Sequence, residues 1–147
     1  MRGLTMLRLA LPLLLALYLP GALAGPVEPG QPLPVLLLKN QHGQDWRVAP
    51  DTKLVLFASG RKASSLLQGV LAPQRGGFLV SRQAVYLADM SKMPGFVTRT
   101  FALPSQRELN FEIGVSLDEK TLAGWPRQDD AVTLIRLDQG RVVSHEF

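Results

Sequence analysis

A short run of apolar residues, KLVLFA at 53–58, constrains the fold more than any other part of this chain. After its lysine the run has no polar position, which is typical of a strand buried on both faces of a sheet. The residues that follow carry apolar side chains at helical spacing, namely Ala63, Leu66, Leu67, Val70 and Leu71. A buried strand that runs into an amphipathic helix across a very short loop predicts an α/β fold.

The same unit recurs further along the chain. Residues 84–89 (AVYLAD) predict a second strand, and residues 91–94 (SKMP) open a second helix, because proline is tolerated in a first helical turn. Pro104 is expected to end that helix. Its buried side is predicted to consist of Phe96, Val97, Thr100 and Phe101.

Further short strands flank these two units, and they are predicted at 33–39, 46–48, 111–117, 131–137 and 141–145. The first two are separated by turn residues at 40–44. The last two are joined by the tight turn Asp138-Gln139-Gly140 and form a β-hairpin. We therefore expect a mixed β-sheet with flanking helices, a C-terminal hairpin and no clear C-terminal helix.

Residues 1–24 are typical of a cleavable secretory signal peptide. Arg2 and Arg8 accompany an apolar core at 7–19, and Ala22-Leu23-Ala24 provides the small residues that a signal peptidase accepts. The core is shorter than the ~20 residues that a membrane-spanning helix requires. We expect cleavage after Ala24, a location in the bacterial periplasm or outside the cell, and no membrane span after cleavage. A proline-rich extended lead-in at 25–34 and a single domain at 35–147 would follow.

Charge and cysteine content exclude several functions. Arg2 and Arg8 would leave with the signal, so that 14 basic residues would stand against 12 acidic ones, and these charges are scattered. Nucleic-acid binding requires a dense basic stripe, and none is present. The chain has no cysteine, which excludes disulfides, thiolate catalysis and cysteine-ligated metal sites.

Three stretches together resemble the thioredoxin superfamily. They are a turn around His42-Gly43, the KLVLFAS segment that runs into a helix, and the hairpin AVTLIRLDQGRVV preceded by Asp118 and Trp125. The peroxiredoxin-like and periplasmic thiol-reductase branches are the most similar, and the likeness covers most of residues 30–145. The resemblance implies a thioredoxin-like domain.

The chain departs from that superfamily where its chemistry lies. The resemblance implies a reactive cysteine in the loop after the KLVLFA strand, but residues 59–64 read SGRKAS. It also implies a cis-proline just before the hairpin, where this chain has Asp129-Asp130. Thiol–disulfide exchange and thiol peroxidase activity need a thiolate, so we do not expect either of them.

Other chemistries find little support in the sequence. His42 and His145 are distant in sequence and no nucleophile elbow is present, so we expect neither a catalytic triad nor a metal site. The adjacent carboxylates Asp118-Glu119 and Asp129-Asp130 would point apart on extended loops. The pair Gly76-Gly77 lacks the third glycine of a dinucleotide-binding turn, and we expect no cofactor.

One constellation favours ligand binding, and it comprises Ser59, Gly60, Arg61, Lys62 and Ser64. Ser59 is predicted to cap the first helix, and the cations, hydroxyls and free backbone N–H groups would bind an anion. The competing interpretation is that Arg61 and Lys62 point into water.

We expect a non-enzymatic protein that binds a small anion, a peptide or a periplasmic partner protein. The alternative is an oxidoreductase with a bound non-thiol cofactor such as a flavin, although no motif supports it. A chromophore in the purified protein would favour that alternative.

Overall fold

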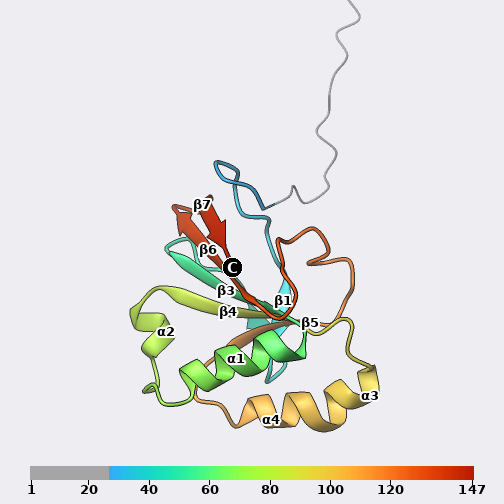
Figure 1. Cartoon of the computed structure of the whole chain (residues 1–147). Helices are drawn as coiled ribbons and strands as arrows, with labels where there is room; N and C mark the ends of the chain where they lie inside the picture. The colour runs from blue at the N-terminus through green and yellow to red at the C-terminus, as the bar shows by residue number, and fades with distance from the viewer. Residues whose placement is uncertain (1–26) are drawn as a thin grey trace, which may run out of the picture.

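The computed structural model describes residues 27–147, so the expected signal peptide lies outside the described residues. Seven strands form one mixed sheet in the order β2-β1-β5-β4-β3-β6-β7 (Figure 1). The strands are β1 (Leu38–Asn40), β2 (Asp45–Trp46), β3 (Leu54–Ser59), β4 (Ala84–Asp89), β5 (Ile113–Ser116), β6 (Val132–Asp138) and β7 (Arg141–Glu146). The helices are α1 (Arg61–Leu71), α2 (Phe78–Ser81), α3 (Gly95–Val97) and α4 (Leu103–Arg107), with a π-helical segment at Thr98–Ala102 between the last two. The expected α/β fold with a mixed sheet, a C-terminal hairpin and no C-terminal helix is confirmed.

The two apolar runs of the sequence form the centre of the sheet. β3 pairs with β4 in parallel and with β6 in antiparallel orientation. Val55, Phe57 and Leu87 are fully buried on one face, and Tyr86 is fully buried on the other. Continuous burial on both faces explains why these strands lack polar alternation.

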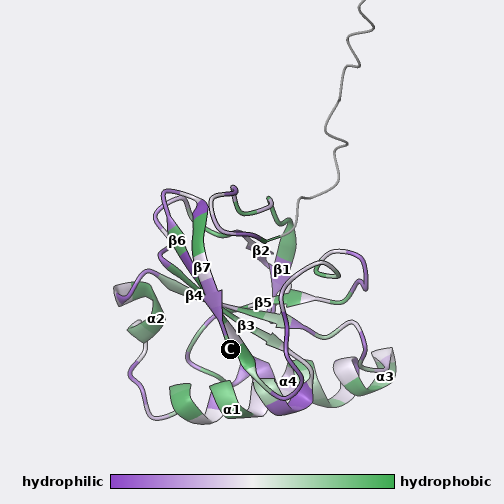
Figure 2. Cartoon of the chain, turned by 45° about the horizontal axis from the view of Figure 1, so that its top comes forward, coloured by the Kyte–Doolittle hydropathy of each residue, from purple (hydrophilic) through white to green (hydrophobic). Residues whose placement is uncertain are grey.

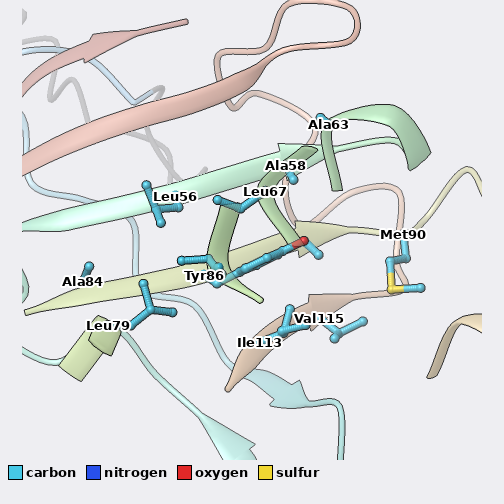
Figure 3. Close-up of a cluster of buried hydrophobic side chains, with 12 residues drawn as sticks. Leu56, Ala58, Ala63, Leu67, Leu79, Ala84, Tyr86, Met90, Ile113 and Val115 are labelled. Carbon is cyan, nitrogen blue, oxygen red and sulfur yellow. The ribbon is translucent and has the colours of Figure 1, made fainter. Parts of the chain in front are cut away.

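The helices lie together on one face of the sheet (Figures 1 and 2). They enclose a core of apolar residues from α1, α2, β3, β4 and β5. Figure 3 shows Tyr86 in the middle of this cluster, with Leu67 of α1 and Ile113 of β5 close to it. The parallel strands and the helices that connect them therefore build this half of the protein.

Within residues 27–147, loops and the N-terminal segment rather than helices cover the opposite face. Its core contains Trp46 of β2, Leu122 and Trp125 of the β5–β6 loop, and Val27 and Leu36 of the N-terminal segment. The phenyl ring of Phe57 meets the Trp125 indole edge-on at 5.5 Å between centroids. Loops and the N-terminal segment thus complete the second layer.

The N-terminal segment also closes one edge of the sheet. The N–H of Gly30 donates to the carbonyl of Val142, and the N–H of Leu33 donates to that of Gly140. The strand predicted at 33–39 is shorter than expected, since Leu33 bonds to the turn before β7 and only Leu38–Asn40 form β1. None of the helices in residues 27–147 is long and apolar enough to cross a membrane.

The predicted stripe of α1 is only partly correct. Ala63, Leu67 and Leu71 are buried against the sheet, but Leu66 and Val70 are 54% and 65% exposed. A helix that rests on one sheet buries a single narrow face, and positions 66 and 70 lie beside that face rather than on it.

The second helix differs more strongly from its prediction. Phe96 and Phe101 are exposed, and the buried positions are Thr98 and Gln106. Pro104 does not end the helix but lies in the first turn of α4. Because proline has no N–H and its ring displaces the carbonyl four residues earlier, the preceding turn widens and Leu103 bonds the Thr98 carbonyl in π fashion.

Candidate functional site

A cavity of about 790 Å³ lies at the carboxyl ends of β3 and β4, between α1 and the α3–α4 segment. This volume is in the range of small-molecule sites, and α/β folds bind their ligands at this edge of the sheet. The wall formed by the β3–α1 junction is polar and comprises Gly60, Arg61, Ser64, Ser65 and Gln68. The opposite wall is largely apolar and includes Met90, Met93, Pro94, Val97, Phe101 and Ala102.

Gly60 makes the turn from β3 into α1. Its φ of 92° and ψ of 167° belong to a region that is essentially restricted to glycine. The prediction that Ser59 caps the helix is wrong, because Ser59 remains in the parallel ladder opposite Asp89 and Gly60 occupies the cap position. No side chain caps α1, and its first turn has no acidic residue.

Three of the five predicted site residues, Gly60, Arg61 and Ser64, line the cavity together. Lys62 does not line it, since its ammonium group lies 3.5 Å from the Asp130 carboxylate on an exposed surface. Successive residues of a helix point about 100° apart, so Arg61 and Lys62 cannot face the same side. Ser59 is also absent from the lining.

Asp89 ends β4 at the cavity, and its side chain is only 5% exposed. Its carboxylate accepts hydrogen bonds from the Ser91 backbone N–H at 3.0 Å and from the Arg127 guanidinium at 2.9 Å. Burial alone would raise the pKa of Asp89, but the bonds from Ser91 and Arg127 outweigh it and hold that pKa below its ordinary value. Arg127 also donates to the carbonyls of Leu122 and Trp125, which ties the β5–β6 loop to the end of β4.

Gln106 of α4 carries an incomplete hydrogen-bond set. The residue is 5% exposed and lines the cavity, and its side-chain NH₂ lies 3.5 Å from the Met90 sulfur. Its side-chain oxygen has no hydrogen-bond partner among residues 27–147. Buried polar groups are nearly always paired, so this carboxamide has unused bonding capacity at the cavity wall.

The Tyr86 hydroxyl is a second buried group without a hydrogen-bond partner in the described chain. It lies close to the side chains of Ser64 and Gln68, which line the cavity. Burial raises the pKa of Tyr86, so its hydroxyl is neutral at physiological pH. It can donate a hydrogen bond but cannot act as a phenolate nucleophile.

Sequence reasoning missed Asp89, Lys92 and Gln106. The first two had a usable signal, because residues that follow two parallel strands meet at one edge of the sheet. Gln106 had none, since it stands in the polar stretch SQREL, which is typical of an exposed helix. Within residues 27–147 no cluster of three potential metal ligands is present.

Comparisons with solved structures reveal similar folds. The chain matches a thio-disulfide isomerase from Thermus thermophilus with a TM-score of 0.52 and 17% identity, over 82% of this chain and 86% of that one. A peroxiredoxin-like protein from Aquifex aeolicus matches with a TM-score of 0.52 and 9% identity, over 84% of this chain and 78% of that one. A thiol peroxidase from Chromobacterium violaceum matches with a TM-score of 0.51 and 16% identity, again over 84% of this chain and 78% of that one. The chain has a thioredoxin-like fold.

The sequence of this thioredoxin-like domain nevertheless differs widely from those of the similar structures. No model of a known protein family matches it, and no curated protein is similar enough to be matched. The thiol chemistry named for the similar structures cannot operate here in the same way, since the chain has no cysteine. The loop at 59–64 instead contributes a glycine turn, a cation and a serine to the cavity.

Proposed function

We propose that this thioredoxin-like protein acts by binding rather than by catalysis, and that its ligand carries an anionic group that enters the cavity between α1 and α3–α4. The observation that carries the proposal is that two cations of the lining, Arg61 and Lys92, form no ion pair within residues 27–147. The unpaired side-chain oxygen of Gln106 lies in the same lining and would accept a hydrogen bond from a donor elsewhere on the ligand.

The charges around the cavity favour an anion. Arg61 and Lys92 line it, and neither forms an ion pair within residues 27–147. The single carboxylate of the lining, Asp89, is already paired with Arg127. The uncapped N-terminus of α1 adds partial positive charge at the same edge.

The double substitution Arg61→Gln and Lys92→Gln is expected to weaken binding of phosphate, sulfate or citrate about tenfold, since a hydrogen bond to a charged group contributes ~1.5 kcal/mol or more. Binding to the intact protein should also weaken with added salt, because exposed charges are screened. Titration followed by the NMR signals of Ser64 and the Gln106 side-chain amide measures both effects.

Lys62→Gln is the matched control for this experiment. Lys62 belongs to the same helix turn as Arg61 but pairs with Asp130 and does not line the cavity. This variant should bind each anion as tightly as the unmodified protein. If no anion moves the Ser64 and Gln106 signals, or if the double variant binds equally well, the proposed function is wrong.

We also propose that the protein works in the periplasm or outside the cell, on the basis of the signal-peptide pattern at 1–24. Protein isolated from the periplasmic fraction is expected to have the intact mass of a chain that begins at Gly25. Recovery of the full-length chain from the membrane fraction would contradict this location.

A further inference from the structure

The two walls of the cavity differ in chemistry. The α1 wall presents Arg61, serine hydroxyls and backbone N–H groups, while the facing wall presents thioether, aliphatic and aromatic side chains beside Lys92, Ser105 and Gln106. A small inorganic anion would use only the polar groups, Arg61 and Lys92 above all. The apolar part of the facing wall would then remain in contact with water, and the free energy falls when a ligand covers apolar surface.

The apolar wall is also suited to ligand contact. Phe101 is 62% exposed at the cavity, and the nearby Phe96 meets it edge-on with 6.2 Å between ring centroids. Met90 and Met93 add flexible thioethers that can adapt to an apolar ligand. The π-helical turn at Thr98–Ala102 holds Phe101 in this position, and such turns occur frequently at functional sites.

We propose that the ligand is an amphipathic carboxylate whose apolar body packs on the α3–α4 wall and whose carboxylate lies between Arg61 and Lys92 at the α1 N-terminus. This inference rests on the proposed function and adds the apolar half of the ligand. Two sources share this chemistry, a linear fatty acid and an apolar peptide with a free C-terminal carboxylate.

Gln106 of α4 contributes to this assignment from the wall that faces α1. Its carboxamide can present an oxygen to a ligand N–H or, after rotation, an NH₂ to a carboxylate oxygen. It therefore serves either source, and a peptide N–H would satisfy the oxygen that has no partner now.

The test is a calorimetric titration with acetate, butanoate, hexanoate and octanoate. Affinity is expected to rise about fourfold for each added methylene, which corresponds to burial of a CH₂ group. 1-Hexanol should bind at least tenfold more weakly than hexanoate, since it has no charge to pair with Arg61 and Lys92. The same titration with N-acetyl-Leu-Leu, with a free carboxylate and as its amide, shows whether the site binds a peptide as well as a fatty acid. Binding of the acid but not of the amide is expected if the ligand is a peptide.

Phe101→Ser is expected to reduce the increase in affinity for each added methylene. Val80→Ser is the matched control and should leave that increase unchanged. Both side chains are exposed, so neither change should unfold the domain, but Val80 on α2 does not line the cavity. Thermal unfolding of both variants checks that they remain folded.

The outcomes separate this inference from the proposed function. If phosphate, sulfate or citrate binds but affinity does not depend on chain length, and the peptide acid does not bind, the binding function stands and the amphipathic ligand is excluded. If hexanol binds as tightly as hexanoate, the carboxylate assignment is overturned. If none of the anions binds, both proposals fail.

Discussion

Replacing Gly114 with alanine is expected to destabilise the protein by about 3 kcal/mol or more, because overpacking of a tight core costs this much. Gly114 lies in β5 between β1 and β4, and a Cβ atom built there meets the Trp46 indole at 2.5 Å. Trp46 is 3% exposed and packs in the core opposite the helices, so it has little space to move away. Urea unfolding followed by tryptophan fluorescence measures the loss.

Gly69→Ala is the matched control for Gly114→Ala and is expected to have the opposite effect on stability. Gly69 lies inside α1, is exposed, and a Cβ atom there meets nothing within 4 Å. Alanine stabilises a helix interior by roughly 0.5–1 kcal/mol relative to glycine, so this variant should be more stable than the unmodified protein. Equal stability of both glycine variants would show that Trp46 does not press on β5.

Arg127→Met is expected to lower the free energy of unfolding by about 3 kcal/mol at neutral pH, since it leaves a buried carboxylate without its cation. The variant also loses the bonds that Arg127 donates to the carbonyls of Leu122 and Trp125. The matched control is Arg136→Met, whose pair with Glu146 is exposed at both ends and contributes ~1 kcal/mol or less.

The pH dependence follows from the lowered pKa of Asp89. A carboxyl group with a lowered pKa in the folded state stabilises the protein above its unfolded pKa of about 4, and that contribution is lost as the pH falls through the folded pKa. In Arg127→Met the pKa of Asp89 should be higher than in the unmodified protein, because only the bonds from Ser91 then oppose the effect of burial. The difference in free energy of unfolding between the unmodified protein and Arg127→Met should therefore shrink below about pH 4. A difference that does not change with pH would contradict the role of Asp89.

The buried strands were predictable because they depend on local pattern. AVYLAD at 84–89 coincides with β4, and the KLVLFA run differs from β3 by one residue at each end. Apart from Lys53 and Asp89 at their ends, both runs consist of apolar residues, so few other structures are compatible with them. The C-terminal hairpin follows in the same way from the turn at Asp138–Gly140.

The second helix could not be predicted because tertiary contacts override its pattern. Phe96 and Thr100, and Val97 and Phe101, are at helical spacing, but the widened turn before Pro104 changes which face meets the sheet. Thr98 and Gln106 are buried instead, and no rule of hydrophobic periodicity selects polar residues for a core.

The candidate site was predictable only on the α1 side. Gly60, Arg61 and Ser64 follow a buried strand, which is where the ligand site of an α/β fold is expected. The sequence pattern places Lys62 beside Arg61 although adjacent helical positions diverge, and it predicts a cap at Ser59 although this residue continues the strand. The apolar wall depends on how α3 and α4 cross the sheet, which the sequence does not encode locally.

The pairing of the two ends of the described chain has a kinetic consequence. Residues 30–33 bond to residues 140–142, and β1 pairs with β5 across most of the domain. Folding that depends on such distant contacts is slow, because each long loop must close before its contacts form. The edge of the sheet at β7 therefore closes only after residues 140–142 have been synthesised. In the exported chain that we propose, this delay would leave the polypeptide extended for long enough to thread through a translocation channel before it folds on the other side.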